Sequence, residues 1–263
     1  MRATPTLMGP GFWARSLEHF KRSATIAFKA EAIKGPSGPY ILQDFRTPGS
    51  TADCKLLSDR EIGGFSESAL DWVPSESTPA GEGAARTGYA RFHGSISTTL
   101  PKDNPKIERT GFAAWRTPNQ KPTVFGKSLW DIDPYVYLAM RVRSDGRSYF
   151  INLQTDSVVA TDLHQHRLFA KRPGEWETVY VKWNDFVRTN HGFVVEPQTE
   201  MLRSKVTTVG VGLTDRRPGP FELCIERVWA TNEVDEAEIE ADGGTVESGL
   251  RNREGKSVRW SAR

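Results

Sequence analysis

The sequence predicts an all-β sandwich preceded by one helix, and three observations carry this prediction. Segments with alternating apolar and polar side chains recur from about Ile41 to Asn232 without intervening helical patterns, which indicates a sandwich rather than a βαβ fold. The 263 residues include 23 glycines and 16 prolines, as many tight turns require. The 8 tryptophans and 13 phenylalanines suit strands that pack aromatic side chains.

Composition along the chain divides it into three segments. Residues 1–40 are predicted to hold an N-terminal amphipathic helix and targeting segment, residues 41–232 a single sandwich domain, and residues 233–263 a disordered, charged tail. The tail is rich in glycine and carries six acids between Glu233 and Asp242, followed by basic residues up to Arg263. The whole chain has 35 Lys plus Arg against 33 Asp plus Glu, and a net charge of +2 gives no reason to expect nucleic-acid binding.

The first segment predicts a helix over Phe12–Lys34, because it contains no Pro or Gly and is stopped by Gly35, Pro36, Gly38 and Pro39. At about 100° per residue, one apolar face collects Trp13, Leu17, Phe20, Ala24, Ala27 and Phe28. Arg15, Arg22 and Lys29 project from the opposite face, on which Ile26 and Ile33 also fall. We expect this helix to dock on a membrane or on hydrophobic subunits through its apolar face. The alternatives are packing on its own domain and a role only in import.

The clearest predicted hairpin joins Tyr135–Arg143 to Ser148–Gln154 through a type I′ turn at Asp145-Gly146, since that turn needs positive φ at both residues. This register places Leu138, Met140 and Val142 opposite Leu153, Ile151 and Tyr149 on a core face. Tyr137, Arg141, Asn152 and Gln154 then share the other face, which is polar and aromatic.

Further strands are predicted at Arg86–Ile96, Gly111–Thr117, Trp176–Trp183, Val206–Thr214 and Gly219–Ala230. In the last of these, Phe221, Leu223, Ile225 and Trp229 alternate with Glu222, Cys224, Glu226 and Val228, so the first four are expected on one face.

No group of residues predicts an enzyme active site, a metal site or a cofactor. Asp162, His164 and His166 are the best metal candidate, but Asp162 is the only adjacent third ligand and no other His lies close in sequence, so two ordinary histidines at a strand or loop edge are favoured. Asp131 and Asp133 are expected to form a turn rather than to bind Ca²⁺. Two cysteines, Cys54 and Cys224, cannot build a disulfide framework and suit a reducing compartment, although they could pair. No apolar run is long enough to span a membrane, and no secretory signal is evident.

A series of short motifs resembles the complex I intermediate-associated protein 30 family, in the family's order and over about Lys55 to Asn232. It opens at Ser58–Ser66, which includes Asp59, Arg60, Gly63 and Gly64. The further motifs are Ala90–Gly94, Arg109–Ala114, Ser128–Ile132 with Trp130, Arg143–Tyr149 with Asp145, Gly146 and Tyr149, Gln165–Arg167 with His166, Gly174–Trp176, Val209–Leu213 and Gly219–Phe221.

The resemblance implies a galactose-binding-like jelly roll and a role as an assembly factor (chaperone or scaffold) for mitochondrial respiratory complex I. It implies action on membrane-arm intermediates, absence from the mature enzyme, and a matrix location peripheral to the inner membrane. The implied partners are membrane-arm subunits and other assembly factors, among them intermediate-associated protein 84. The arrangement of a short helix followed directly by the domain is most similar to the fungal members.

The motif residues also have plain structural interpretations, which we favour over direct partner contact. The glycine pairs allow positive φ at turns, and Trp130 and Trp176 are expected to fill the core. Two other functions are weighed against the assembly role. A carbohydrate-binding module would use the Tyr137, Arg141, Asn152 and Gln154 face as its platform. An enzyme would need a metal at His164 and His166.

Overall fold

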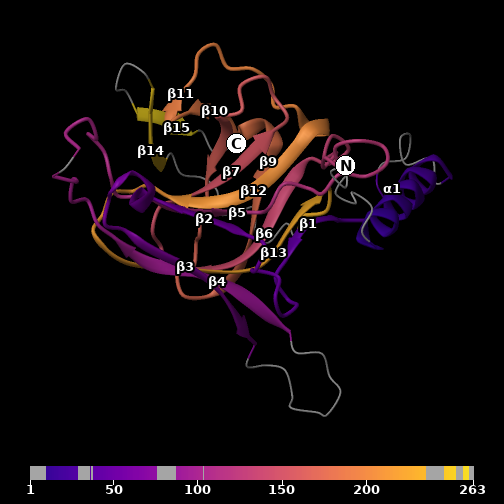
Figure 1. Cartoon of the computed structure of the whole chain (residues 1–263), viewed down its shortest axis with the longest axis horizontal. Helices are drawn as coiled ribbons and strands as arrows, with labels where there is room; N and C mark the ends of the chain where they lie inside the picture. The colour runs from indigo at the N-terminus through magenta and orange to yellow at the C-terminus, as the bar shows by residue number, and fades with distance from the viewer. Residues whose placement is uncertain are drawn as a thin grey trace, which may run out of the picture.

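The computed structural model describes residues 10–28, 36, 38–75, 87–102, 104–234, 246–252 and 257–260. These residues form two packed β-sheets with one helix, α1 (Pro10–Phe28), beside them (Figure 1). The predicted fold class, a β-sandwich with an N-terminal helix, is confirmed. The described part of α1 ends at Phe28, and residues 29–34, which the sequence also assigns to the helix, lie outside the described residues.

Sheet A, as we name the smaller sheet, has a strongly non-sequential order. Its strands run β3 (Glu67–Pro74), β4 (Gly88–Ile96), β13 (Gly219–Thr231), β6 (Tyr137–Ser144) and β9 (Trp176–Lys182), with β1 (Tyr40–Asp44) also paired to β13. Every pairing is antiparallel. The long strand β13 therefore holds the sheet together, because it pairs with three other strands.

Sheet B is the second layer. Its order is β15 (Ser257–Trp260), β14 (Val246–Asn252), β11 (Phe193–Val194), β10 (Val187–Asn190), β8 (Asp162–Arg167), β7 (Tyr149–Thr155), β12 (Val206–Leu213), β5 (Ala113–Arg116) and β2 (Lys55–Ser58). Single turns of 3₁₀ helix lie at η1 (Asp59–Ile62), η2 (Trp183–Asp185) and η3 (Arg203–Lys205). Strands β14 and β15 fall in the segment for which the sequence predicts disorder. The backbone of β14 pairs in parallel with β11.

The five separate segments predicted as strands are β4, β5, β9, β12 and β13, with ends that differ by at most two residues. Their bounds are read well because strand alternation breaks at Gly, Pro and charged residues on either side. The prediction for β13 fails at one point. A bulge between Ile225 and Arg227 shifts the register, so Val228 turns to the core and Trp229 turns to the outer face.

The predicted hairpin between β6 and β7 is wrong. Strand β6 pairs with β13 and β9 in sheet A, whereas β7 pairs with β8 and β12 in sheet B. Gly146 has φ 86°, but Asp145 does not have positive φ, so the turn is not type I′. At this turn the chain leaves sheet A and enters sheet B. Turn chemistry specifies the reversal and not the partner strand.

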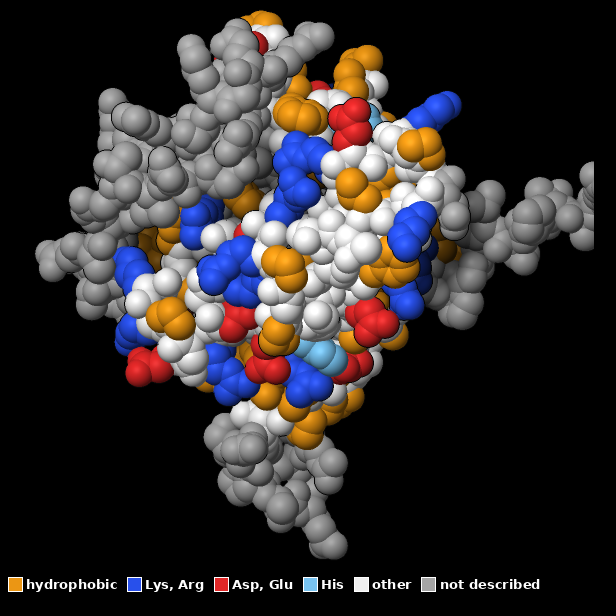
Figure 2. Space-filling view, turned by 90° about the vertical axis from the view of Figure 1, so that its left-hand side faces the viewer, with side chains coloured by type: hydrophobic (Ala, Val, Ile, Leu, Met, Phe, Trp, Pro, Cys, Tyr) orange, Lys and Arg blue, Asp and Glu red, His pale blue; other side chains and the backbone are white. Residues whose placement is uncertain are grey.

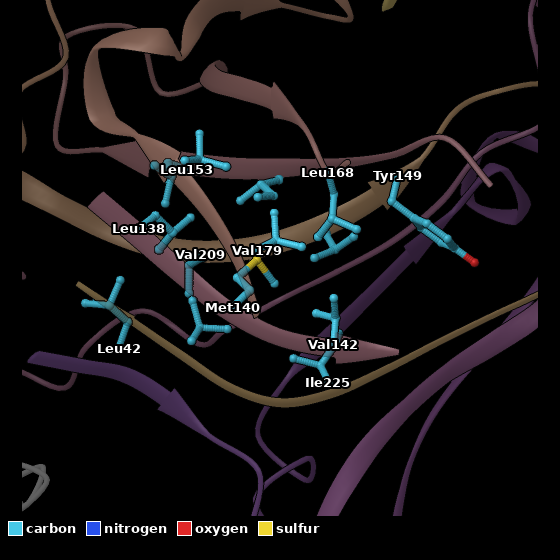
Figure 3. Packing of buried hydrophobic residues seen from close by; sticks show 14 of the residues in the cluster. Leu42, Leu138, Met140, Val142, Tyr149, Leu153, Leu168, Val179, Val209 and Ile225 are labelled. Atoms are coloured by element: carbon cyan, nitrogen blue, oxygen red, sulfur yellow. The ribbon is translucent and has the colours of Figure 1, made fainter. Parts of the chain in front are cut away.

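The predicted core faces are nevertheless correct, because alternation along a strand is independent of its partner. Leu138, Met140 and Val142 point into the sandwich from β6 and meet residues such as Leu153 and Val209 from sheet B (Figure 3). The polar platform is overturned by the same geometry. Tyr137 and Arg141 lie on the outer face of sheet A, whereas Asn152 and Gln154 lie on the outer face of sheet B.

Candidate functional site

Helix α1 lies beside the sandwich near β1 (Figure 1), and its polar side chains hold it there. Arg15 Nη2 donates to the carbonyl of Pro122 at 3.4 Å, and Ser16 Oγ accepts from the backbone N–H of Val124 at 3.1 Å. The ring of His19 stacks on Phe125 with 5.3 Å between centroids. These helix residues lie on one face at i, i+1 and i+4, so the 122–125 loop fixes the rotation of α1.

A further contact extends this polar face by one turn. The guanidinium of Arg22 lies over the ring of Tyr40, 3.4 Å from its centroid, and Tyr40 in turn stacks on Tyr135. Burial raises the pKa of the Tyr40 hydroxyl, while the positive charge of Arg22 acts in the opposite direction. A cation over a partly desolvated ring contributes about 1–2 kcal/mol, so this contact anchors the helix to the first strand of sheet A.

The opposite face of α1 carries an apolar stripe, which we define as Trp13, Leu17 and Phe20. Their exposed fractions are 58%, 53% and 59%. At i, i+4 and i+7 they share one side of the helix, as the sequence predicts. The side chain of Phe28, the rest of the predicted face, lies outside the described residues, as does Lys29.

The apolar stripe and the basic residues therefore lie on opposite faces of α1, as expected. The basic residues, however, contact the chain's own domain. The sequence leaves Arg15 and Arg22 free to reach acidic headgroups or subunits, whereas the structure turns them onto the chain's own domain. The helix thus packs on the domain and still presents large apolar side chains to solvent. These are separate faces, so the two predicted roles do not exclude each other.

The surface at the other end of the molecule differs from α1. Figure 2 views the side that lies at the left in Figure 1, and hydrophobic side chains there are scattered singly among charged ones. Single exposed apolar residues are ordinary on folded proteins, whereas a row of three large ones on one helix face is typical of a contact surface. The stripe is therefore the strongest candidate docking site among the described residues.

The first family motif forms a tightly built loop around Asp59. This carboxylate is fully buried and accepts three hydrogen bonds, from Ser66 N (2.9 Å), Ser66 Oγ (2.8 Å) and Gly111 N (2.6 Å). A Cβ at Gly64 would lie 2.6 Å from Asp59 Oδ1, so only glycine fits there. Gly63 has φ 88°, and Arg60 reaches an exposed ion pair with Glu67 at 3.6 Å. The motif fixes the loop before β3.

The family motif Arg143–Tyr149 ties two connections together. Arg147 forms a bidentate pair with Asp215, with 3.0 Å and 2.7 Å between nitrogen and oxygen, and both side chains are largely buried. Tyr149 donates to Asp145 Oδ2 at 3.1 Å, and its oxygen points away from the core cluster in Figure 3. Burial, then the nearby Asp145 carboxylate, raise the pKa of Tyr149. The network joins the β6–β7 turn to the β12–β13 connection.

The histidines of β8 do not form a metal site with Asp162. His164 and His166 share a face, as predicted, but that face is paired with Leu153 and Ile151 on the core side. The ring of His166 packs against Phe169 and Phe186. Burial, and then the charge of Arg188, lower the pKa of His164.

Asp162, the third residue of that candidate, accepts a hydrogen bond from Asn190 Nδ2 at 2.7 Å. Across the described part of the chain, no three His, Cys, Asp or Glu side chains are grouped as metal ligands. The other acidic candidate behaves as expected, since Asp131 Oδ1 accepts from Asp133 N at 3.1 Å in a turn. Cys54 and Cys224 are both free thiols.

The aromatic motif residues divide between core and surface. Trp130 lies in the core cluster, as predicted, and Phe221 packs there against Phe92. Trp176 does not fill the core, because the alternation of β9 places it on the outer face of sheet A, edge-to-face with Tyr89. No helix in the described ranges is long and apolar enough to cross a membrane.

The fold places the chain in the class of β-sandwich proteins. The solved structure of a family 11 carbohydrate-binding module from a Clostridium thermocellum cellulase matches with a TM-score of 0.51 at 10% identity, over 76% of this chain and 98% of that one. At this identity the likeness concerns the β-sandwich alone. The model of the complex I intermediate-associated protein 30 family matches residues 43–225, and the chain belongs to that family.

Two relatives show how far the similarity reaches. "Complex I intermediate-associated protein 30, mitochondrial" of Neurospora crassa is 54% identical, over 100% of this chain and 99% of its own length. The Drosophila melanogaster protein with the same description is 27% identical, over 80% of this chain and 67% of its own length. The similarity to the fungal relative thus includes α1 and the residues after β13.

Proposed function

We propose that the chain is a non-catalytic assembly factor of mitochondrial respiratory complex I. The observation that carries the proposal is the 54% identity, over the whole chain, to a relative described as a mitochondrial complex I intermediate-associated protein. The factor acts on membrane-arm intermediates together with other assembly factors and is absent from the finished enzyme. Its place is the matrix side of the inner membrane.

The apolar stripe of α1 supports the membrane contact in this proposal. Trp, Leu and Phe on one face of a helix are typical of helices that lie in a membrane interface. Burial of each large apolar side chain contributes roughly 1.5–3 kcal/mol, so three of them suffice for peripheral binding. The occupant we propose is the lipid bilayer surface. Because Arg15, Ser16 and Arg22 hold the polar face on the domain, docking of α1 would also fix the orientation of the sandwich.

The sandwich has the properties of a scaffold. Its loops are fixed by buried, fully bonded groups such as Asp59 and the Arg147–Asp215 pair, which favour a rigid surface.

Sugar binding has no comparable support. The side chains that suggest a platform are split between two outer faces, and the likeness to the carbohydrate-binding module extends to the fold only.

The test is deletion of the gene in a fungal host with a functional complex I. We expect assembled complex I to disappear from a native gel, while the other respiratory complexes stay at their normal level. Re-expression of the intact chain should restore complex I, and the tagged chain should be absent from the mature enzyme band. Normal complex I in the deletion strain would refute the proposal.

A further inference from the structure

The outer face of sheet A concentrates arginine and aromatic side chains. Its members are Tyr89 and Arg91 on β4, Arg227 and Trp229 on β13, Tyr137, Arg141 and Arg143 on β6, and Trp176, Tyr180 and Lys182 on β9. We name this set the arginine face. Arginine, tyrosine and tryptophan are the residues enriched at the centres of protein interfaces. The composition therefore indicates a contact surface distinct from α1.

Arg141 and Arg227 are direct cross-strand partners at the centre of this face. Like charges directly opposite each other destabilise a sheet pair unless an anion lies between them. Within the part of the chain that the structure describes, no carboxylate forms an ion pair with either guanidinium. Asp44 stands opposite Arg227 in the register, but Arg46 is the main cause of the lowered pKa of Asp44, and Arg46 Nε donates to both Asp44 oxygens at 3.0 Å and 3.1 Å. The charge of Arg227 contributes less to lowering this pKa.

Two of these arginines, Arg227 and Arg143, lie against aromatic rings, whereas Arg141 Nη1 donates to Thr178 Oγ1 at 3.5 Å. The guanidinium of Arg227 lies 4.3 Å from the ring centroid of Trp229. That of Arg143 lies 5.6 Å from the rings of both Tyr89 and Trp176, which meet edge-to-face. Stacked guanidinium groups are pre-organised for bidentate recognition of carboxylates.

A second opposed basic pair shows which part of this arrangement is unusual. Lys55 and Arg116 are also cross-strand partners, on β2 and β5 of sheet B. However, β2 is the edge strand of its sheet, and Lys55 is exposed. Water can solvate that pair, whereas Arg141 and Arg227 are half-buried on strands with neighbours on both sides.

The side chains of the arginine face favour a protein partner over a lipid bilayer or a nucleic acid. None of the large hydrophobic side chains that are strongly exposed belongs to it, so it offers nothing to insert into a bilayer. A nucleic-acid surface would need a continuous basic field, but Glu222, 3.9 Å from Arg143, and Asp71 interrupt this one. Carboxylates presented with apolar side chains between them match the alternation of guanidinium groups and rings.

We propose that the arginine face binds an acidic segment of a partner protein, with Arg141 and Arg227 as its paired carboxylate receptor. The inference rests on the proposed assembly role, since it specifies the chemistry of a partner that such a factor would hold. The outer face of a sheet suits a segment whose carboxylates project from one side. Trp229 and the Tyr89–Trp176 pair would pack on the apolar side chains between them.

The first test measures binding of a fluorescent ten-residue peptide of alternating Glu and Ala to the full chain at low salt, by anisotropy. A Gln-Ala peptide is the uncharged control. We expect the Glu-Ala peptide to bind, and the pair Arg141→Gln and Arg227→Gln to weaken binding by tenfold or more. The matched pair Lys55→Gln and Arg116→Gln removes the same charge from the other sheet and should change binding less than twofold. Lysine at positions 141 and 227 should restore only part of the affinity.

The second test expresses the same variants in the deletion strain, with protein level and melting temperature as controls for folding. We expect the Lys55/Arg116 variant to restore complex I and the Arg141/Arg227 variant to restore it poorly although it is present and folded. Equal peptide binding by the two double variants would overturn the inference, as would binding of vesicles or of an oligonucleotide instead of the peptide through Arg141 and Arg227. Normal complex I in the deletion strain would refute the assembly role alone, because the peptide measurement does not depend on it.

Discussion

The hydroxyl of Ser16 in α1 accepts a hydrogen bond from the backbone N–H of Val124, with 3.1 Å between the two atoms, and donates to the carbonyl of Phe12 at 2.9 Å. Ser16 is the most buried described side chain of the helix, with 5% exposed. It marks the line along which α1 meets the domain. The apolar stripe lies away from that line, so its contacts with an outside surface can be removed without disturbing the attachment of the helix.

We expect the substitutions Trp13→Ser, Leu17→Ser and Phe20→Ser to abolish binding to cardiolipin-containing liposomes. The three side chains together would contribute roughly 4.5–9 kcal/mol on burial in the bilayer interface. A flotation assay measures the bound fraction, and binding by the intact chain should tolerate moderate salt because the driving force is apolar.

The control for this assay removes exposed apolar side chains elsewhere, with Val158→Ser, Val159→Ser and Leu202→Ser, and should float like the intact chain. If the intact chain itself stays in the soluble fraction, the bilayer is not the occupant of the stripe. In that case a hydrophobic subunit remains as the alternative, and binding to that subunit should be lost in the triple α1 variant.

Gly146→Val should lower the melting temperature by several degrees. Gly146 has φ 86°, which costs a β-branched residue on the order of 1–3 kcal/mol, and a Cβ there would lie 3.2 Å from Pro173 Cγ. Circular dichroism on heating measures the change. Gly38→Val is the control, because Gly38 lacks positive φ and has no atom within 4 Å of an added Cβ. Identical melting of the two variants would contradict the geometry of this turn.

Asp59→Asn should destabilise the fold by about 3 kcal/mol, because an amide nitrogen replaces one of two oxygens that accept three buried N–H and O–H groups. Urea unfolding gives the free energy directly. Asp53→Asn is the matched change at an exposed aspartate and should stay within about 0.5 kcal/mol of the parent chain. Equal midpoints for the two variants would show that the Asp59 network contributes little.

His164 should make stability fall in mild acid. Its pKa in the folded chain lies below the ordinary 6.5, because burial and then the charge of Arg188 disfavour the imidazolium. The unfolded chain therefore takes up the proton first, so this contribution is fully present above pH 6.5 and is lost as the pH falls from there through the folded pKa.

Urea unfolding at pH 7.5 and pH 5 measures this effect. The loss of unfolding free energy on acidification should be smaller in His164→Gln than in the parent chain. His191→Asn, at an exposed histidine with φ 49°, should keep the parent's pH dependence. The same pH dependence in all three proteins would exclude His164 as its source.

Local alternation predicted most of the strands and their core faces, because neighbouring side chains of a strand point to opposite sides whatever it pairs with. Pairing itself could not be predicted in the same way. Asp145-Gly146 has the chemistry of a hairpin turn, but Asp145 Oδ2 accepts hydrogen bonds from the Tyr149 hydroxyl and from Glu222 N of β13, contacts that a local turn signal does not reveal. The bulge that turns Trp229 outward has no local sequence signal either.

The apolar stripe and the arginine face also differ in whether the local sequence predicts them. The apolar stripe follows from helical periodicity, so the sequence alone predicts it. The arginine face does not, because Arg141 and Arg227 lie far apart in the chain and meet only through the pairing of β6 with β13. The predicted carbohydrate platform is wrong for the same reason, since it assumes that β6 pairs with β7.

The central position of β13 also bears on the order in which the fold can form. All three of its partners, β1, β4 and β6, precede it in the chain, so during synthesis they emerge before the strand that joins them. Until Gly219–Thr231 arrives, β3–β4 and β6–β9 are separate pairs, each with an open hydrogen-bonding edge. Such edges pair readily with other chains, and pairings between distant segments form slowly. A nascent or truncated chain that ends before β13 is therefore the form most prone to aggregate.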